Sequence, residues 1–150
     1  MMRPRLLIAV LAAVLITPLA HSKQLAVVTD AANPVAEMSS AELIKIFNLH
    51  TRSWADGRTV VLVLRDPSSS EMHIALRKLF NMTPAEASTF IQSHRGAIMV
   101  ADSDDAVIRF VSATRGAIGV IDLYSLTKDV KVLKIDGKLP VEQGYLLKGE

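Results

Sequence analysis

The chain of 150 residues contains no cysteine. This absence excludes disulfide bonds, thiolate metal sites and cysteine nucleophiles. Its four histidines, at positions 21, 50, 73 and 94, show no zinc-binding spacing. Trp54 is the only tryptophan, and beside the turn residue Gly57 we expect it to serve as a packing residue. The sequence therefore predicts neither a metal nor a cofactor.

The amino terminus has the three-part pattern of a secretory signal peptide. Residues 1–5 carry two arginines, residues 6–16 are an unbroken apolar run, and small residues follow at Ala20 and Ser22. The apolar run is too short to span a bilayer comfortably, although a retained membrane anchor is the alternative. We predict a signal peptide over residues 1–22, cleaved after Ser22 or, as second choice, after Ala20, and a periplasmic location.

A strong net charge is also missing once this leader is removed. Loss of Arg3 and Arg5 takes the formal charge of the precursor from +2 to 0. A neutral chain gives no reason to expect nucleic acid or an anionic membrane as partner. The remaining residues, 23–150, are enough to bury one hydrophobic core without disulfide bonds or metal sites to stabilise it, so we predict a single domain.

Expected strands and helices alternate along most of this domain. The expected strands cover residues 25–28, 59–64, 97–101, 117–121 and 130–135, with a further edge strand over 141–147. The helices are expected after the capping boxes at 39–42 and 83–86, after the loop 65–71 as far as about residue 81, and after the acidic cluster 102–105. We interpret that cluster as a solvated helix start, since its spacing matches no calcium loop. The alternation predicts an α/β fold with a three-layer, mostly parallel sheet and helices on both faces.

The loop 65–71 is the candidate binding site. It leads from the carboxyl end of an apolar strand into the amino end of a helix, where ligands often dock in open α/β sheets. Arg65 offers a donor fork suited to phosphate-like oxygens, and the serines 68–70 and the first helical N–H groups could add donors. In an equally weighted alternative, a serine caps the helix and Arg65 pairs with Asp66 or Glu71.

A hydrolase can be assembled on paper from Ser69, His73 and a distant aspartate. Any chain of this size offers such combinations, so they carry little weight without geometry. That hypothesis requires His73 or His94 to lie within hydrogen-bond reach of a serine. We therefore predict no catalytic residue.

Several short motifs follow one another between residues 33 and 121. They are Asn33-Pro34-Val35, Ser39-x-x-Glu42-Leu43-x-x-Ile46-Phe47, Trp54-x-x-Gly57, Arg65-x-x-x-Ser69 and Gly116-Ala117-Ile118-Gly119-Val120. In order and spacing the chain resembles the phosphate-binding proteins of ABC transporters, in the type 2 periplasmic binding protein (PBP-like) superfamily. The resemblance implies a non-enzymatic, exported solute-binding protein that works with a membrane transporter.

The same resemblance implies that Arg65, Ser69 and Ser70 hold phosphate or a similar oxyanion. The family pattern after the arginine is Ser-Gly-Thr, whereas Ser69 is followed here by Ser70 and Glu71. The family closes two lobes around its ligand, and this chain has the length of a single PBP-like lobe. A second hypothesis is therefore an interaction or sensor-accessory module that has lost small-anion binding and forms a homodimer or docks on a membrane partner.

Overall fold

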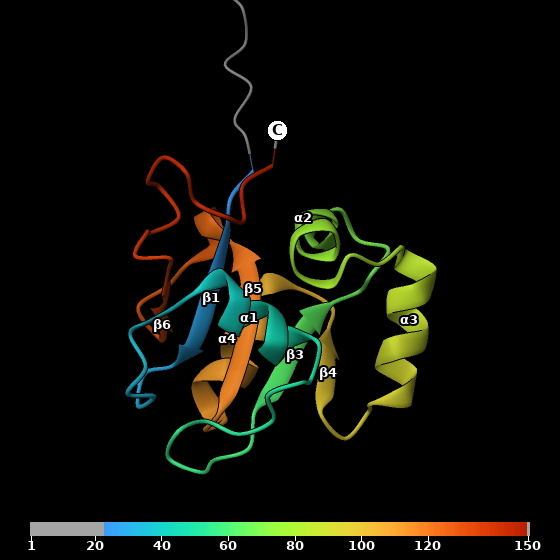
Figure 1. The fold of residues 1–150 in the computed structure, drawn as a ribbon, viewed down its shortest axis with the longest axis horizontal. Helices are drawn as coiled ribbons and strands as arrows, with labels where there is room; N and C mark the ends of the chain where they lie inside the picture. Colours follow the sequence, from blue (N-terminus) through green and yellow to red (C-terminus); the bar gives the residue numbers. More distant parts are fainter. Residues whose placement is uncertain (1–22, 150) are drawn as a thin grey trace, which may run out of the picture.

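The computed structural model describes residues 23–149, so the predicted signal peptide lies outside the described residues (Figure 1). Its centre is a five-stranded sheet with the strand order β4-β3-β5-β1-β6. The strands are β1 (Leu25–Asp30), β3 (Val61–Arg65), β4 (Ile98–Ala101), β5 (Ala117–Asp122) and β6 (Val130–Val132). Among the described residues, no helix is long and apolar enough to cross a membrane.

Four strands of the sheet share one direction. β3 pairs in parallel with both β4 and β5, and β1 pairs antiparallel with both β5 and β6. β1 therefore runs against the other four. All six residues of β1 are buried, as are the three central residues of β3, because helices cover both faces of the sheet. The predicted mostly parallel α/β sheet is confirmed.

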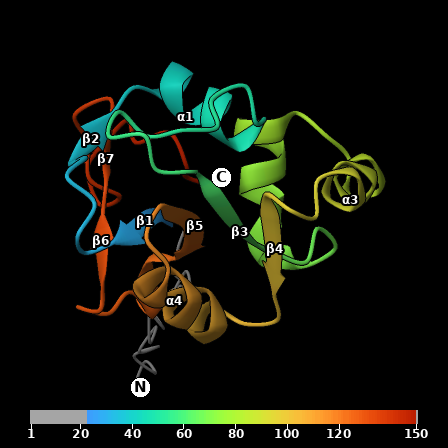
Figure 2. The same ribbon diagram turned by 90° about the horizontal axis from the view of Figure 1, so that it is seen from below.

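The helices form the outer layers (Figure 2). On one face lie α1 (Ser40–Phe47) and the helical segment made of η1 (Ser70–Met72), α2 (His73–Ala75) and the π-helical η2 (Leu76–Phe80). On the other face lies α4 (Asp104–Ala113). The helix α3 (Pro84–Ser93) packs against η2, with the rings of Phe80 and Phe90 edge to face at 6.1 Å. The predicted three-layer arrangement is confirmed.

The helix starts lie where the capping residues predict them. The Ser39 hydroxyl accepts a hydrogen bond from the Glu42 N–H at 3.1 Å. Thr83 and Glu86 form a reciprocal capping box, in which each side chain accepts from the other residue's backbone N–H. Local side-chain chemistry therefore sets these boundaries.

The segment expected as one strand over 130–135 is divided between two sheets. β6 ends at Val132, and β7 (Lys134–Ile135) pairs in parallel with β2 (Glu37–Met38) in a separate two-stranded sheet. The Leu133 N–H still donates to the Val27 carbonyl at 2.9 Å, whereas the next N–H, of Lys134, donates to Ala36. The change of partner falls at Leu133, whose fully buried side chain packs in the core.

The expected edge strand over 141–147 is wrong. Turns occupy this segment, with N–H groups of Glu142 and Tyr145 donating to carbonyls three residues earlier. The segment is held instead by the Tyr145 hydroxyl, which donates to the Leu25 carbonyl at 2.7 Å, and by Leu147, which is fully buried. Backbone pairing is confined to the end of the segment, where the Leu147 carbonyl accepts from the Leu25 N–H at 2.9 Å and an isolated antiparallel bridge joins Lys148 to Gln24.

Candidate functional site

Arg65 is the last residue of β3, at the carboxyl edge of the sheet. Its side chain is 15% exposed, and its guanidinium faces two carboxylates. Nη1 donates to Asp104 Oδ1 at 2.7 Å, and Nη2 lies 3.7 Å from Glu71 Oε2. The third guanidinium nitrogen, Nε, is buried and has no hydrogen-bond partner among the described residues. The ion pair with Glu71 was one of the alternatives from sequence, while the pair with Asp104 was not expected.

Asp104 is a site residue that the sequence interpretation missed. It is the first residue of α4, and its side chain is only 11% exposed. One carboxylate oxygen pairs with Arg65, and the other accepts from the Asp122 N–H at 3.0 Å and from the Ser125 hydroxyl at 2.8 Å. The predicted helix start is confirmed, but the expectation that its acidic side chains are solvated is wrong for Asp104. The available signal was topological, because the residues after neighbouring parallel strands meet at one edge of the sheet.

The three serines of the loop have different roles. The Ser68 and Ser69 hydroxyls both donate to Asp66, the first to its carboxylate and the second to its carbonyl, each at 2.6 Å. Ser69 occupies the N-cap position of η1 but makes no side-chain cap bond, so the capping alternative is wrong for this residue. Ser70 is exposed, and its hydroxyl makes no hydrogen bond with the described residues. Of the three serine hydroxyls in the loop, only that of Ser70 is thus without a hydrogen-bond partner among the described residues.

Glu71 adds negative charge to this edge. A hydrogen bond from its own backbone N–H, and then the charges of Arg65 and Lys23, lower the pKa of the Glu71 carboxyl from its ordinary value of 4.5, against an opposing effect of partial burial. Lys23 Nζ lies 3.9 Å from Glu71 Oε1. The loop therefore carries an ionised carboxylate at neutral pH.

Replacing Glu71 with glutamine should change how stability depends on pH. A pKa that is lower in the folded chain stabilises it above the unfolded pKa, and this contribution is lost as the pH falls through the folded pKa. We expect wild type to be more stable than Glu71→Gln at neutral pH, and the difference to shrink between about pH 5 and about pH 2. Urea unfolding at each pH measures it. The control is Glu37→Gln, since Glu37 forms no ion pair with the described residues. A difference that persists unchanged into acid would contradict the role of the ionised carboxylate.

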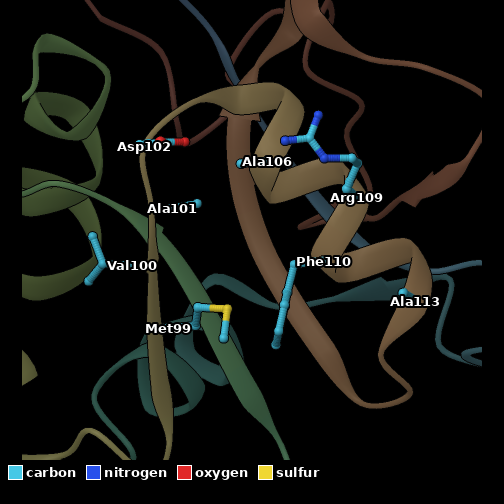
Figure 3. A pocket seen from close by; sticks show the side chains of 8 residues that line it. All are labelled: Met99, Val100, Ala101, Asp102, Ala106, Arg109, Phe110 and Ala113. Carbon is cyan, nitrogen blue, oxygen red and sulfur yellow. The ribbon is translucent and has the colours of Figure 1, made fainter.

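The loop does not line any of the five principal cavities of the described residues. The largest, of about 580 Å³, lies between β4 and α4 (Figure 3). Met99 and Phe110 point toward this space, whereas Val100 points to the other side of the strand. The candidate site from sequence therefore lies outside these five cavities.

The geometry gives no support to the hydrolase hypothesis. Among residues 23–149, no hydrogen bond joins a histidine to a serine, and the His94 ring bonds through Nδ1 to the Phe90 carbonyl at 2.8 Å. Over the same range, no cluster of three histidine or acidic side chains could hold a metal ion.

Comparisons with known proteins bear on the fold. No protein-family model matches the chain, and no curated protein sequence matches it. Solved structures do match. An ABC-type phosphate transport receptor from Vibrio cholerae has 19% identity and a TM-score of 0.72, over 85% of this chain and 54% of the receptor. PstS from Borrelia burgdorferi has 21% identity and a TM-score of 0.69, over 86% of this chain and 55% of that one.

A third match is a substrate-binding protein structure from Clostridium perfringens with bound phosphate. It has 18% identity and a TM-score of 0.65, over 79% of this chain and 47% of that one. The chain thus spans about half the length of the structures that it resembles. This chain has the PBP-like fold of phosphate ABC transporter substrate-binding proteins, over about one half of such a protein.

Proposed function

We propose that this protein is an exported, non-enzymatic solute-binding protein that takes phosphate or a similar oxyanion at the loop 65–71. Arg65, Ser69 and Ser70 would hold the anion. The observation that carries the proposal is the place of Arg65, at the carboxyl end of β3 and directly before the serine loop that opens the η1–η2 helical segment. The fold of phosphate-binding proteins supports the same ligand class, a periplasmic location and an ABC transporter as partner.

The contacts of Arg65 suggest how an anion would enter. Asp104 holds Nη1 firmly at 2.7 Å, whereas Glu71 lies 3.7 Å from Nη2, beyond a hydrogen bond. An oxyanion would displace Glu71 and take donors from Nη2, Nε and the free hydroxyl of Ser70. Ser69 would turn its hydroxyl from the Asp66 carbonyl toward the ligand. Glu71 is thus the competitor for the anion, and Asp104 keeps the guanidinium in place.

Replacing Glu71 with threonine should strengthen oxyanion binding by about tenfold or more. The change removes the carboxylate that competes with the anion for Arg65 Nη2, and supplies the hydroxyl found in the family pattern. Isothermal titration calorimetry with phosphate and with sulfate, on wild type and variant, measures the effect. The control is Glu37→Thr, which makes the same substitution on the separate two-stranded sheet. Absence of heat for both wild type and Glu71→Thr at millimolar ligand would overturn the proposal.

No observation on the described residues favours the homodimer or the sensor-accessory module. Both stay predictions from sequence. The transporter partner is the simpler proposal, because two of the matched structures are named as components of phosphate transport systems.

A further inference from the structure

A cavity of about 320 Å³ opens at the amino edge of the sheet, opposite the loop 65–71. It lies where the chain enters β3 and β4, since Val60 and Ala97, directly before these strands, both line it. Its polar lining comes from two segments far apart in sequence: Arg52 and Thr59 on one side, and Ser93, His94, Arg95 and Gly96 on the other. The fold therefore gathers these groups, and no local motif does.

The charge of this cavity is positive. Two arginines line it, and no acidic residue does. Neither Arg52 nor Arg95 forms an ion pair within residues 23–149. The neighbouring Arg58, by contrast, is taken by Asp56, whose carboxylate lies 2.7 Å from it. An anion in the cavity would thus find two uncommitted guanidinium groups, which is the opposite of the situation at Arg65.

Neutral donors complete the lining. The Gly96 N–H and the Thr59 hydroxyl make no hydrogen bond with the described residues. The His94 ring is fixed by its Nδ1 bond to the Phe90 carbonyl and by contact with the Phe90 ring at 4.6 Å between centroids. A carbonyl only accepts, so the hydrogen sits on Nδ1, and Nε2 of the neutral ring can only accept. His94 therefore shapes the lining, and the donors for an anion are the two guanidinium groups, the Gly96 N–H and the Thr59 hydroxyl.

We propose that this cavity binds a small oxyanion group of the phosphate or sulfate class, independently of the loop 65–71. Arginine forks and backbone N–H groups are the donors that such oxygens recruit in proteins. The volume lies at the lower end of the range for small-molecule pockets, so it suits one such group with little attached to it. The group can belong to a free anion or to a phospholipid headgroup, and the experiment separates these sources.

The two probes are inorganic phosphate and pyrophosphate. Nuclear magnetic resonance titrations of the protein follow their binding through the backbone amide resonances. We expect the Gly96 and Arg95 amides to shift saturably. The double variant Arg52→Gln/Arg95→Gln removes two exposed cations and should weaken this site at least about tenfold. The control Arg77→Gln/Lys78→Gln makes the same charge change at exposed positions outside the cavity and should leave the affinity within about twofold.

A second variant tests the cavity by filling it. A Cβ at Gly96 would meet no atom within 4 Å, so Gly96→Val should fold normally and block the ligand. Cosedimentation with vesicles of anionic phospholipid gives the second arm. Binding there that the double variant abolishes assigns the site to a headgroup, and saturation by free phosphate without vesicle binding assigns it to a soluble anion.

The proposal of this site is overturned if neither probe shifts the Gly96 amide resonance and the protein does not bind to the vesicles. It is also overturned if the double variant binds as tightly as wild type. These outcomes are separate from those of the proposed function. An anion held only at the loop 65–71 would shift the Ser69 and Ser70 amides and respond to Glu71→Thr, while leaving Gly96 unmoved.

Discussion

Replacing Arg65 with methionine should lower the free energy of unfolding by about 3–5 kcal/mol. The stability is lost because Asp104 would remain without its cationic partner. Asp104 is only 11% exposed, and without the guanidinium at 2.7 Å its carboxylate would be a largely buried charge with no cation beside it. Its remaining bonds, to the Asp122 N–H and the Ser125 hydroxyl, cannot neutralise that charge. Urea unfolding at neutral pH, followed by the fluorescence of Trp54, measures the change.

Two further variants separate this cause from simple loss of packing. Arg65→Met/Asp104→Asn removes both charges and should recover most of the lost stability, because no uncompensated ion remains. Arg58→Met breaks the more exposed pair with Asp56, which is also 2.7 Å long, and should cost much less stability than Arg65→Met, because water screens an exposed ion pair. If Arg65→Met costs no more than Arg58→Met, the guanidinium does not stabilise Asp104 in the way proposed here.

This coupling decides how the loop must be tested for binding. A variant of Arg65 that fails to bind an oxyanion has also lost the link between β3 and α4, so the two effects mix. Glu71 is the cleaner position, because its side chain is 30% exposed and its contacts with Arg65 and Lys23 are long. A higher oxyanion affinity in Glu71→Thr would therefore report on the binding site alone, since a loss of folding cannot raise the affinity.

Local sequence patterns predict most of the architecture. The apolar run at 59–64 becomes β3 with a shift of one or two residues, because its side chains pack under helices on both faces. The capping boxes at 39–42 and 83–86 begin helices where expected, because a hydroxyl three residues before a free N–H satisfies it wherever the chain goes next. These strand and helix positions depend on residues that are close in sequence, so they can be predicted from local sequence patterns.

The errors concern partners far apart in the chain. Asp104 satisfies every local rule for a helix start, yet its carboxylate forms an ion pair with Arg65, 39 residues earlier. The segment 141–147 has an apolar content that favours a strand, but its Tyr145 hydroxyl bonds to a carbonyl 120 residues away. The cationic cavity is likewise formed by Arg52 and Arg95 from different connections. Such sites become visible only when the strand order is known.

Replacing Gly116 with alanine should cost about 3 kcal/mol of stability, a sum of two effects. Gly116 has φ +85°, and a residue with a Cβ pays about 1–2 kcal/mol in this left-handed region. A Cβ would also lie 2.3 Å from the Thr59 carbonyl oxygen, a backbone atom that can move only with its strand. Relieving that overlap adds about 1–3 kcal/mol. Thermal or urea unfolding of the variant gives the total.

The position is this constrained because three hydrogen bonds meet at Gly116. Its carbonyl accepts from the Trp54 indole at 2.9 Å and from the Val61 N–H at 3.1 Å, and its N–H donates to the Asp30 carboxylate at 3.2 Å. The matched control is Gly57→Ala, with φ +87° but no atom within 4 Å of the added Cβ, which should cost only about 1–2 kcal/mol. Equal losses for the two variants would contradict the close approach of the Thr59 carbonyl. A larger loss at Gly116 assigns the difference to that approach, and hence to the packing of the segment before β3 against the start of β5.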